Sequence, residues 1–103
     1  MSAQDDTRFA PGLIDETRTR EPRRFKVLLH NDDYTSMEFV VHVLRGVFQK
    51  PEHEAMRIML AVHKQGLGEC GEYTAEVAET KVDTVHAMAK AAGFPLRASM
   101  EEV

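Results

Sequence analysis

Tryptophan is absent from this 103-residue sequence and cysteine occurs once, at Cys70, so no disulfide can form within the chain. A single cysteine fits a protein of the reducing cytoplasm. No apolar run approaches the length of a membrane span, and the first residues lack the core of a signal peptide. Acidic residues outnumber basic ones, with a formal net charge of -4, so the basic stripe typical of nucleic-acid binding is missing. These absences predict a small, soluble, cytoplasmic domain with neither a membrane nor a nucleic-acid partner.

The first 22 residues differ in composition from the rest of the chain. Charged side chains of both signs are mixed there with scattered apolar groups, and no helical or strand period holds. Such a segment cannot bury enough apolar surface to offset the entropy lost on ordering. We therefore predict a disordered extension over residues 1–22 and one folded domain over residues 23–103. From composition alone, an inert solubilising extension is favoured over a tether that reaches a partner.

The hydrophobic residues of the remaining chain change their period from element to element. Residues 25–30 alternate at period two, as a strand does, and residues 37–48 repeat at helical spacing. Pro51 is suited to the first position of a second helix, which Gly66 ends. The other expected elements are a glycine-rich loop over 66–71, a half-buried strand over 72–77, a helix over 78–92 and a short strand over 96–101. The order β-α-α-β-α-β predicts an α+β domain with three helices on one face of a small three-stranded antiparallel sheet.

The junction between the first strand and the first helix carries a concentration of polar groups. Asn31, Asp32 and Asp33 favour a turn, because short polar side chains hydrogen-bond nearby backbone. Thr35, followed three residues later by Glu38, is typical of a capping box at a helix start. A junction that holds two carboxylates and an amide is suited to bind something polar, ideally a cation.

Apolar residues of two helices could enclose a pocket beside this junction. If the helices pack side by side, Met37 and Val40 of the first would face Met59 and Val62 of the second. The result would be a small apolar pocket with carboxylates, an amide and an imidazole at its mouth. The same residues are equally well explained as ordinary core beside a capped turn, and periodicity does not separate the two interpretations.

His63 is the histidine best placed for chemistry, because it borders the apolar stripe of the second helix. No paired motif such as HxxxH or CxxC is present, so a metal site would need His63, Cys70 and a carboxylate to converge. A hydrolase could be imagined from Ser36, His63 and Asp33, but no Gly-x-Ser-x-Gly elbow surrounds Ser36. We expect no catalytic residue, no metal and no cofactor. A small metal-dependent or hydrolytic enzyme using His63 and Asp33 is the alternative.

Several separated segments resemble the ClpS adaptors, small bacterial proteins of the N-degron pathway. They are residues 27–40 (VLLHNDDYTSMEFV), 59–66 (MLAVHKQG), 70–73 (CGEY) and 76–81 (EVAETK), with Pro95-Leu96 near the end. Order and spacing match from about residue 25 to residue 101, so the resemblance is specific. It implies a binding protein and not an enzyme. It also implies that the chain binds substrates whose first residue is Leu, Phe, Tyr or Trp and delivers them to the ClpAP protease.

The resemblance assigns roles to individual residues. The substrate α-amino group is expected to contact Asn31, Asp32, Asp33 and His63. The hydrophobic pocket is expected to be lined by His30, Thr35, Met37, Val40, Met59, Val62 and Leu96. Within it, Met37 would be the gate that excludes β-branched residues.

The resemblance also implies a protein partner. Glu76 and Lys81, and with less support Tyr34, are expected to contact the N-terminal domain of the ClpA ATPase. The chain is expected to be a monomer. The first 22 residues resemble the family's extension, which engages the ATPase during delivery, and this reverses the interpretation drawn from composition alone. A third interpretation is a module that binds only the ATPase; Asp33→Ala would then leave the affinity for any peptide unchanged.

Two positions depart from the family's pattern. Ser36 stands where most members have proline, which we expect to loosen the helix start. His30 replaces the usual aliphatic residue just before Asn31, and a polar pocket wall there would narrow the range of accepted residues. Some bacteria carry a second, more selective paralogue with changes in this region. We therefore hypothesise a preference for aromatic first residues over leucine.

Overall fold

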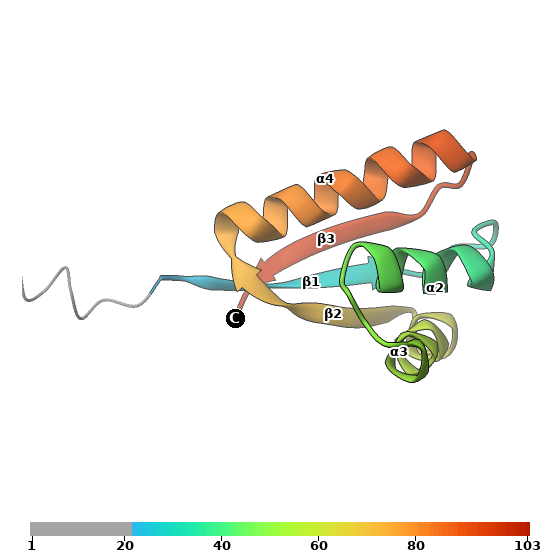
Figure 1. Ribbon diagram of the computed structural model, residues 1–103, viewed down its shortest axis with the longest axis horizontal. Coiled ribbons are helices and arrows are strands. Elements are labelled where there is room, and N and C mark those ends of the chain that lie inside the picture. The colour runs from blue at the N-terminus through green and yellow to red at the C-terminus, as the bar shows by residue number, and fades with distance from the viewer. Residues whose placement is uncertain (1–21) are drawn as a thin grey trace, which may run out of the picture.

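The computed structural model describes residues 22–103, which form three strands and three helices (Figure 1). The elements are β1 (Arg24–His30), α2 (Met37–Gly46), α3 (Glu52–Gln65), β2 (Leu67–Thr74), α4 (Ala75–Ala92) and β3 (Arg97–Glu102). The strand order is β2-β1-β3, and both pairs are antiparallel. The predicted α+β fold is confirmed. The extension predicted over residues 1–22 lies outside the described residues, apart from Pro22.

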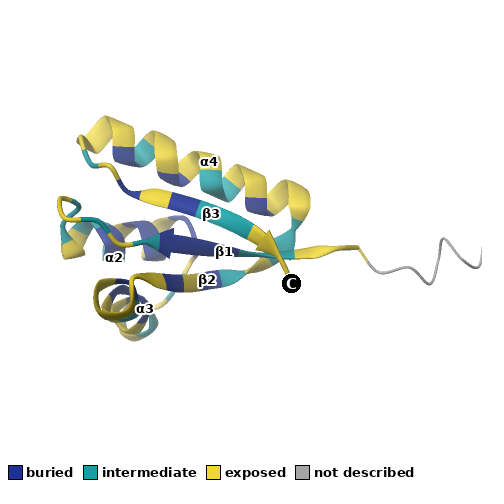
Figure 2. Ribbon diagram, turned by 180° about the vertical axis from the view of Figure 1, so that it is seen from behind, coloured by how far each residue is buried: buried dark blue, intermediate teal, exposed yellow. Residues whose placement is uncertain are grey.

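The helices pack on one face of the sheet, and the opposite face carries none (Figures 1 and 2). Val27 and Leu29 of the central strand are fully buried in the core with Leu44 of α2, Ile58 of α3 and Val85 of α4. This arrangement agrees with the prediction of helices on one side. Among residues 22–103, none of the helices combines the length and apolar character that crossing a membrane requires.

The segment 66–71 was predicted as a loop, and this prediction is wrong, because β2 begins at Leu67. A Cβ atom on Gly68 would lie 2.8 Å from Cγ2 of Val62, so only glycine lets β2 approach α3 this closely. Gly71, with φ of 147°, pairs with Val27 where the register shifts. Such an irregularity is a β-bulge. These glycines therefore serve a close approach and a bulge rather than a loop.

The strand predicted over 72–77 extends three residues beyond the observed end of β2. β2 finishes at Thr74, and α4 begins at Ala75 rather than at residue 78. Gly93 ends α4 as predicted, with its N–H bonded to the carbonyls of Ala89 and Lys90. The last strand begins at Arg97, so it is shifted only slightly from its predicted position.

Candidate functional site

Asp32 holds the turn that joins β1 to α2. Its carboxylate accepts hydrogen bonds from the backbone N–H of Tyr34 at 2.8 Å, and from the N–H and hydroxyl of Thr35, each at 2.7 Å. Burial opposes ionisation of Asp32, but these three bonds together hold its pKa below the usual value. The carboxylate is therefore a fixed negative charge in a defined turn.

Helix α2 begins at Met37 and is capped by Ser36. The Ser36 hydroxyl accepts a hydrogen bond from the N–H of Phe39 at 3.1 Å. The predicted capping box of Thr35 and Glu38 is therefore wrong, because Thr35 gives its hydroxyl to Asp32 instead. Serine is among the favoured N-cap residues, and the loosening expected from serine in place of proline stays a prediction.

A backbone hydrogen bond connects this turn to the end of α3. The N–H of Asn31 donates to the carbonyl of Gly66 at 2.9 Å, and the N–H of Gly66 donates to the carbonyl of Val62 at 3.0 Å. Gly66 ends α3 in the left-handed conformation, with φ of 96°. His63 lies in the last turn of that helix. The connection therefore brings His63 to the same end of the molecule as Asn31 and the two aspartates.

A cavity of about 440 Å³ lies between this turn, α2 and α3. Its lining residues are Asn31, Asp32, Asp33, Tyr34, Thr35, Ser36, Met37, Val40, Met59, Val62 and His63. Val40, Met59 and Val62 are buried and form its apolar part, whereas Met37 is half-exposed. We call the exposed trio Asn31, Asp33 and His63 the cavity rim.

The charge at the cavity has one sign. Asp32 and Asp33 contribute two carboxylates, and none of the lining residues is a lysine or an arginine. Asn31 adds an amide oxygen, and His63 adds a ring nitrogen that can accept a hydrogen bond when neutral. The arrangement can therefore bind a small cationic group that is attached to an apolar side chain.

Two residues that were predicted for the pocket do not line the cavity. Nε2 of His30 lies 2.6 Å from Oγ of Ser99, beside β3. Burial, and then the positive charge of Arg97, lower the pKa of His30, against the opposing effect of Glu101. The polar wall expected from His30 is therefore absent, because side chains alternate along β1 and this one lies on the face away from Leu29. Leu96 is buried in the core.

The residues predicted for the ATPase contact differ in their surroundings. Tyr34 lies at the cavity and is 78% exposed. Glu76 is exposed in the first turn of α4. The Lys81 ammonium instead donates to the carbonyl of Val47 at 2.7 Å and lies over the rings of Phe48 and Tyr73. Lys81 therefore connects α4 to the end of α2.

A metal site was expected to need His63, Cys70 and a carboxylate, and these groups do not converge, although Asp33, Ser36 and His63 all line the cavity. Cys70 is fully buried, and burial raises the pKa of its thiol to about 12, which is typical of an unreactive cysteine. It is not among the residues that line the cavity with His63. Within residues 22–103, no group of three or more His, Cys, Asp and Glu side chains could hold a metal ion.

Sequence reasoning missed two contributions to this site. Ser36 lines the cavity as well as capping α2, and Gly66 positions Asn31 through its carbonyl. Ser36 could have been found from its favoured N-cap chemistry and its place just before Met37. The Gly66 contact joins distant parts of the chain through backbone atoms, so no residue type marks it.

Comparisons with known proteins give one consistent family. Residues 20–99 match the family described as ATP-dependent Clp protease adaptor protein ClpS. The ATP-dependent Clp protease adapter protein ClpS of Oleidesulfovibrio alaskensis is 64% identical over 97 residues, which cover 94% of this chain and 93% of the relative. A relative of the same name from Desulfatibacillum aliphaticivorans is 68% identical over 84 residues, which cover 82% of this chain and 81% of the relative. The solved structure of Agrobacterium tumefaciens ClpS2 bound to L-phenylalaninamide has a TM-score of 0.78 and 38% identity, and covers 81% of this chain and 100% of that chain.

Proposed function

This chain belongs to the ClpS family of ATP-dependent Clp protease adaptor proteins, and from that membership we propose that it delivers substrates with hydrophobic first residues to the ClpAP protease. Members of the family are adaptors without catalytic activity. The alternative of a metal-dependent or hydrolytic enzyme using His63 and Asp33 is therefore withdrawn. We place its activity in the cytoplasm, with the protease.

The observation that carries the proposal is the cavity, in which hydrogen-bond acceptors surround an apolar interior. A free protein N-terminus presents an ammonium group with three donors next to the first side chain. We assign the ammonium to the cavity rim, where Asn31, Asp33 and His63 are exposed. Asp32 adds negative charge while its oxygens hold the turn.

The first side chain of the substrate would lie against the apolar part of the cavity. Val40, Met59 and Val62 supply that surface, with Thr35 beside them, and Met37 would be the gate against β-branched residues. The ClpS2 structure, with its bound L-phenylalaninamide, supports acceptance of an aromatic first residue. Leu, Phe, Tyr and Trp are proposed as accepted residues. A preference for aromatic ones stays a prediction, and it would have to come from the shape of the cavity, since His30 does not line it.

Simple magnitudes indicate that both halves of the cavity are needed. Burying one Leu or Phe side chain contributes about 1.5–3 kcal/mol. Each hydrogen bond to the charged ammonium contributes roughly 1.5–3 kcal/mol. Micromolar affinity requires about 8 kcal/mol. Neither the apolar contact nor one polar contact reaches that value alone, so two or three bonds to the ammonium must accompany the buried side chain.

Delivery requires a second surface on the same molecule. We propose that the N-terminal domain of ClpA binds a monomer of this chain around the first turn of α4, with Glu76 exposed to receive it. Lys81 would support this surface mainly by holding α4 against the end of α2. Tyr34 belongs to the opposite end, at the cavity, so we give it a smaller part in this contact.

A degradation assay tests the proposal. Purified ClpAP should degrade a reporter with an N-terminal Phe faster when this chain is added, and a reporter with an N-terminal Val should show no such gain. Glu76→Ala should reduce the gain, whereas Glu79→Ala, which changes another exposed glutamate of α4, should not. Equal degradation of both reporters with and without the chain would contradict the proposal.

A further inference from the structure

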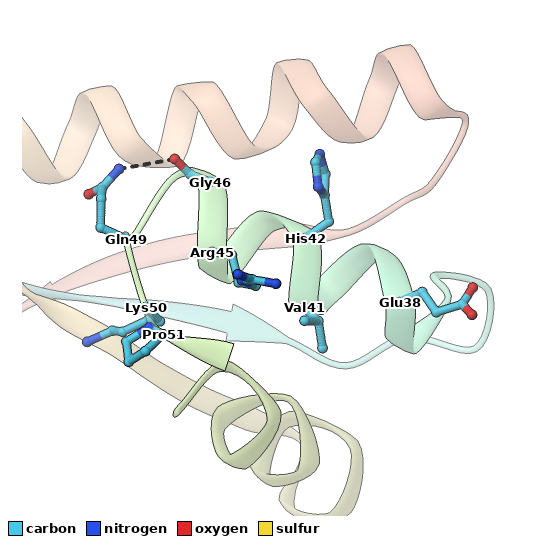
Figure 3. Close-up of a pocket in the computed structure, with 8 residues that line it drawn as sticks. All are labelled: Glu38, Val41, His42, Arg45, Gly46, Gln49, Lys50 and Pro51. Carbon is cyan, nitrogen blue, oxygen red and sulfur yellow. Dashed lines mark hydrogen bonds between the residues drawn. The ribbon is translucent and has the colours of Figure 1, made fainter. Parts of the chain in front are cut away.

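A second hollow lies on the outer side of α2 (Figure 3). It has a volume of about 770 Å³ and runs from Glu38 along α2 to Lys50 and the start of α3. We call it the α2 groove. In Figure 3, Glu38 lies at one end, Arg45 lies along the helix, and Lys50 lies at the opposite end. No residue of the α2 groove is assigned a role in the function proposed above.

The α2 groove begins beside the cavity. Met37 lines the cavity and Val41 lines the α2 groove, and these residues are one helical turn apart on α2. Met37 is half-exposed and Val41 is partly buried, so they form an apolar edge shared by the two hollows. A chain whose first side chain occupies the cavity can therefore cross this edge and continue along α2.

The charges along the α2 groove change sign with distance from the cavity. Glu38 lies near the cavity, His42 follows it along α2, and Arg45 and Lys50 lie farthest from the cavity. Neither Arg45 nor Lys50 forms an ion pair with a carboxylate of residues 22–103. This positive end contrasts with the chain as a whole, whose formal net charge is -4. It favours a negatively charged partner.

The spacing fixes where along a substrate that charge would lie. At about 1.5 Å rise per helical residue, Arg45 is roughly 12 Å along α2 from Met37. An extended peptide advances about 3.3 Å per residue, so about four residues span that distance. A substrate that places its first side chain beside Met37 would bring its fourth to sixth residues to Arg45 and Lys50.

We infer that the α2 groove binds the part of the substrate that follows the N-terminal residue, and that it favours acidic side chains at about the fourth to sixth positions. This inference rests on the proposed function, because it takes the first residue to occupy the cavity. It adds a second criterion to substrate choice: the charge of the segment behind the first residue.

Three peptides test the inference in fluorescence anisotropy titrations of the full chain. All begin with an unblocked Phe and share uncharged second and third residues, and they carry Asp, Ser or Lys at positions four to six. At low salt the Asp peptide should bind tighter than the Lys peptide, by roughly twofold to fivefold for each exposed charge contact. The difference should shrink at high salt, because exposed charges are screened.

Matched variants assign the difference to the α2 groove. Arg45→Gln combined with Lys50→Gln should bring the ratio of the Asp and Lys affinities close to one. Arg57→Gln removes an exposed positive charge from α3, where Arg57 pairs with Glu54, and should leave the ratio unchanged. Equal affinities for the three peptides in the parent chain, or an unchanged ratio in the double variant, would overturn the inference.

Failure of the proposed function gives a different result. If acetylating the Phe amine left the affinity unchanged, the cavity would not bind the N-terminus, although the Asp and Lys peptides could still differ. If none of the unblocked peptides bound, both the proposed function and this inference would be overturned.

Discussion

The cavity rim and Lys81 use their polar groups differently. The rim residues Asn31, Asp33 and His63 are exposed, and their side chains form no hydrogen bond with another of residues 22–103. Lys81 is half-buried and donates a hydrogen bond to the carbonyl of Val47. Both regions bring polar groups together from distant parts of the chain. At the rim, the fold leaves those groups available to a ligand. At Lys81, the fold uses the charge internally. Rim substitutions should therefore lower the affinity for peptides with little change in stability. Lys81 substitutions should lower the stability with little change in peptide affinity.

Rim substitutions should give the largest effect on binding. Replacing Asn31 and Asp33 together by Ala removes two acceptors for the ammonium. Because each hydrogen bond to a charged group contributes roughly 1.5–3 kcal/mol, affinity for a Phe-initiated peptide should fall by about a hundredfold or more. Calorimetric titration measures the loss. Thermal unfolding of the variant should be nearly unchanged, and an unaltered affinity would support a module that binds only the ATPase.

Gly68→Ala should give the largest loss of stability. The added methyl would meet Cγ2 of Val62 at 2.8 Å and the carbonyl of Ile58 at 3.1 Å, so β2 must move away from α3. Overpacking of this kind typically costs about 1–3 kcal/mol. Urea unfolding measures the loss, and peptide affinity should fall as well, because Val62 lines the cavity.

Gly46→Ala is the matched control for that change. A methyl on Gly46 meets no atom within 4 Å, and the residue lies in α2. Alanine is the better helix former, so this variant should be as stable as the parent or slightly more so. If Gly46→Ala and Gly68→Ala lost equal stability, the close approach of β2 to α3 would not explain the need for glycine at position 68.

Lys81→Met tests the internal use of charge. The substitution keeps an apolar stem but removes the donor to the Val47 carbonyl and the cation over Phe48 and Tyr73. Loss of one hydrogen bond and of partly exposed cation–π contacts should lower the free energy of unfolding by about 1–2 kcal/mol. Peptide affinity should stay within about twofold of the parent, because Lys81 does not line the cavity.

Lys90→Met controls for the general loss of a lysine from α4, because Lys90 is exposed in the last turn. It should change stability less than Lys81→Met does. A Lys81 variant of parental stability that nevertheless fails in ClpAP-dependent degradation would show that the Lys81 ammonium contacts the ATPase directly.

The smallest expected effect concerns Asp32 and acid. Its folded-state pKa lies below the ordinary value of 3.8 because of hydrogen bonds from Thr35 and Tyr34 that outweigh burial. Its contribution to stability is therefore fully present above pH 3.8 and is lost as the pH falls through the folded-state pKa. Asp32→Asn should destabilise the protein at pH 7 more than at pH 3, as urea unfolding at both values can measure. Asp33→Asn is the control, because the Asp33 carboxylate accepts no hydrogen bond from residues 22–103, and it should cost less stability at pH 7 than Asp32→Asn does.

Periodicity along the sequence was enough to predict the order of strands and helices, because hydrophobic spacing depends on local geometry. It failed at Gly68 and Gly71, where glycine marks a close approach and a bulge that depend on distant residues. It also failed at Thr35, since only the folded turn shows that Asp32 takes its hydroxyl.

Residue chemistry and the resemblance indicated the same pocket, beside the turn that follows β1. Residues of the turn, of both helices and His63 line one cavity, whereas His30 and Leu96 do not line it. His30, at the end of β1, lies beside Ser99, and Leu96, just before β3, is buried in the core. The direction in which a side chain points at the end of a strand depends on register, which the sequence alone did not reveal.

Calorimetric titration of one Phe-initiated peptide, with its amine free and with its amine acetylated, tests the central claim most directly. If the rim binds the ammonium, acetylation removes the charge and donors together, and affinity should fall by about a hundredfold or more. Equal affinities of the free and the acetylated peptide would contradict the account.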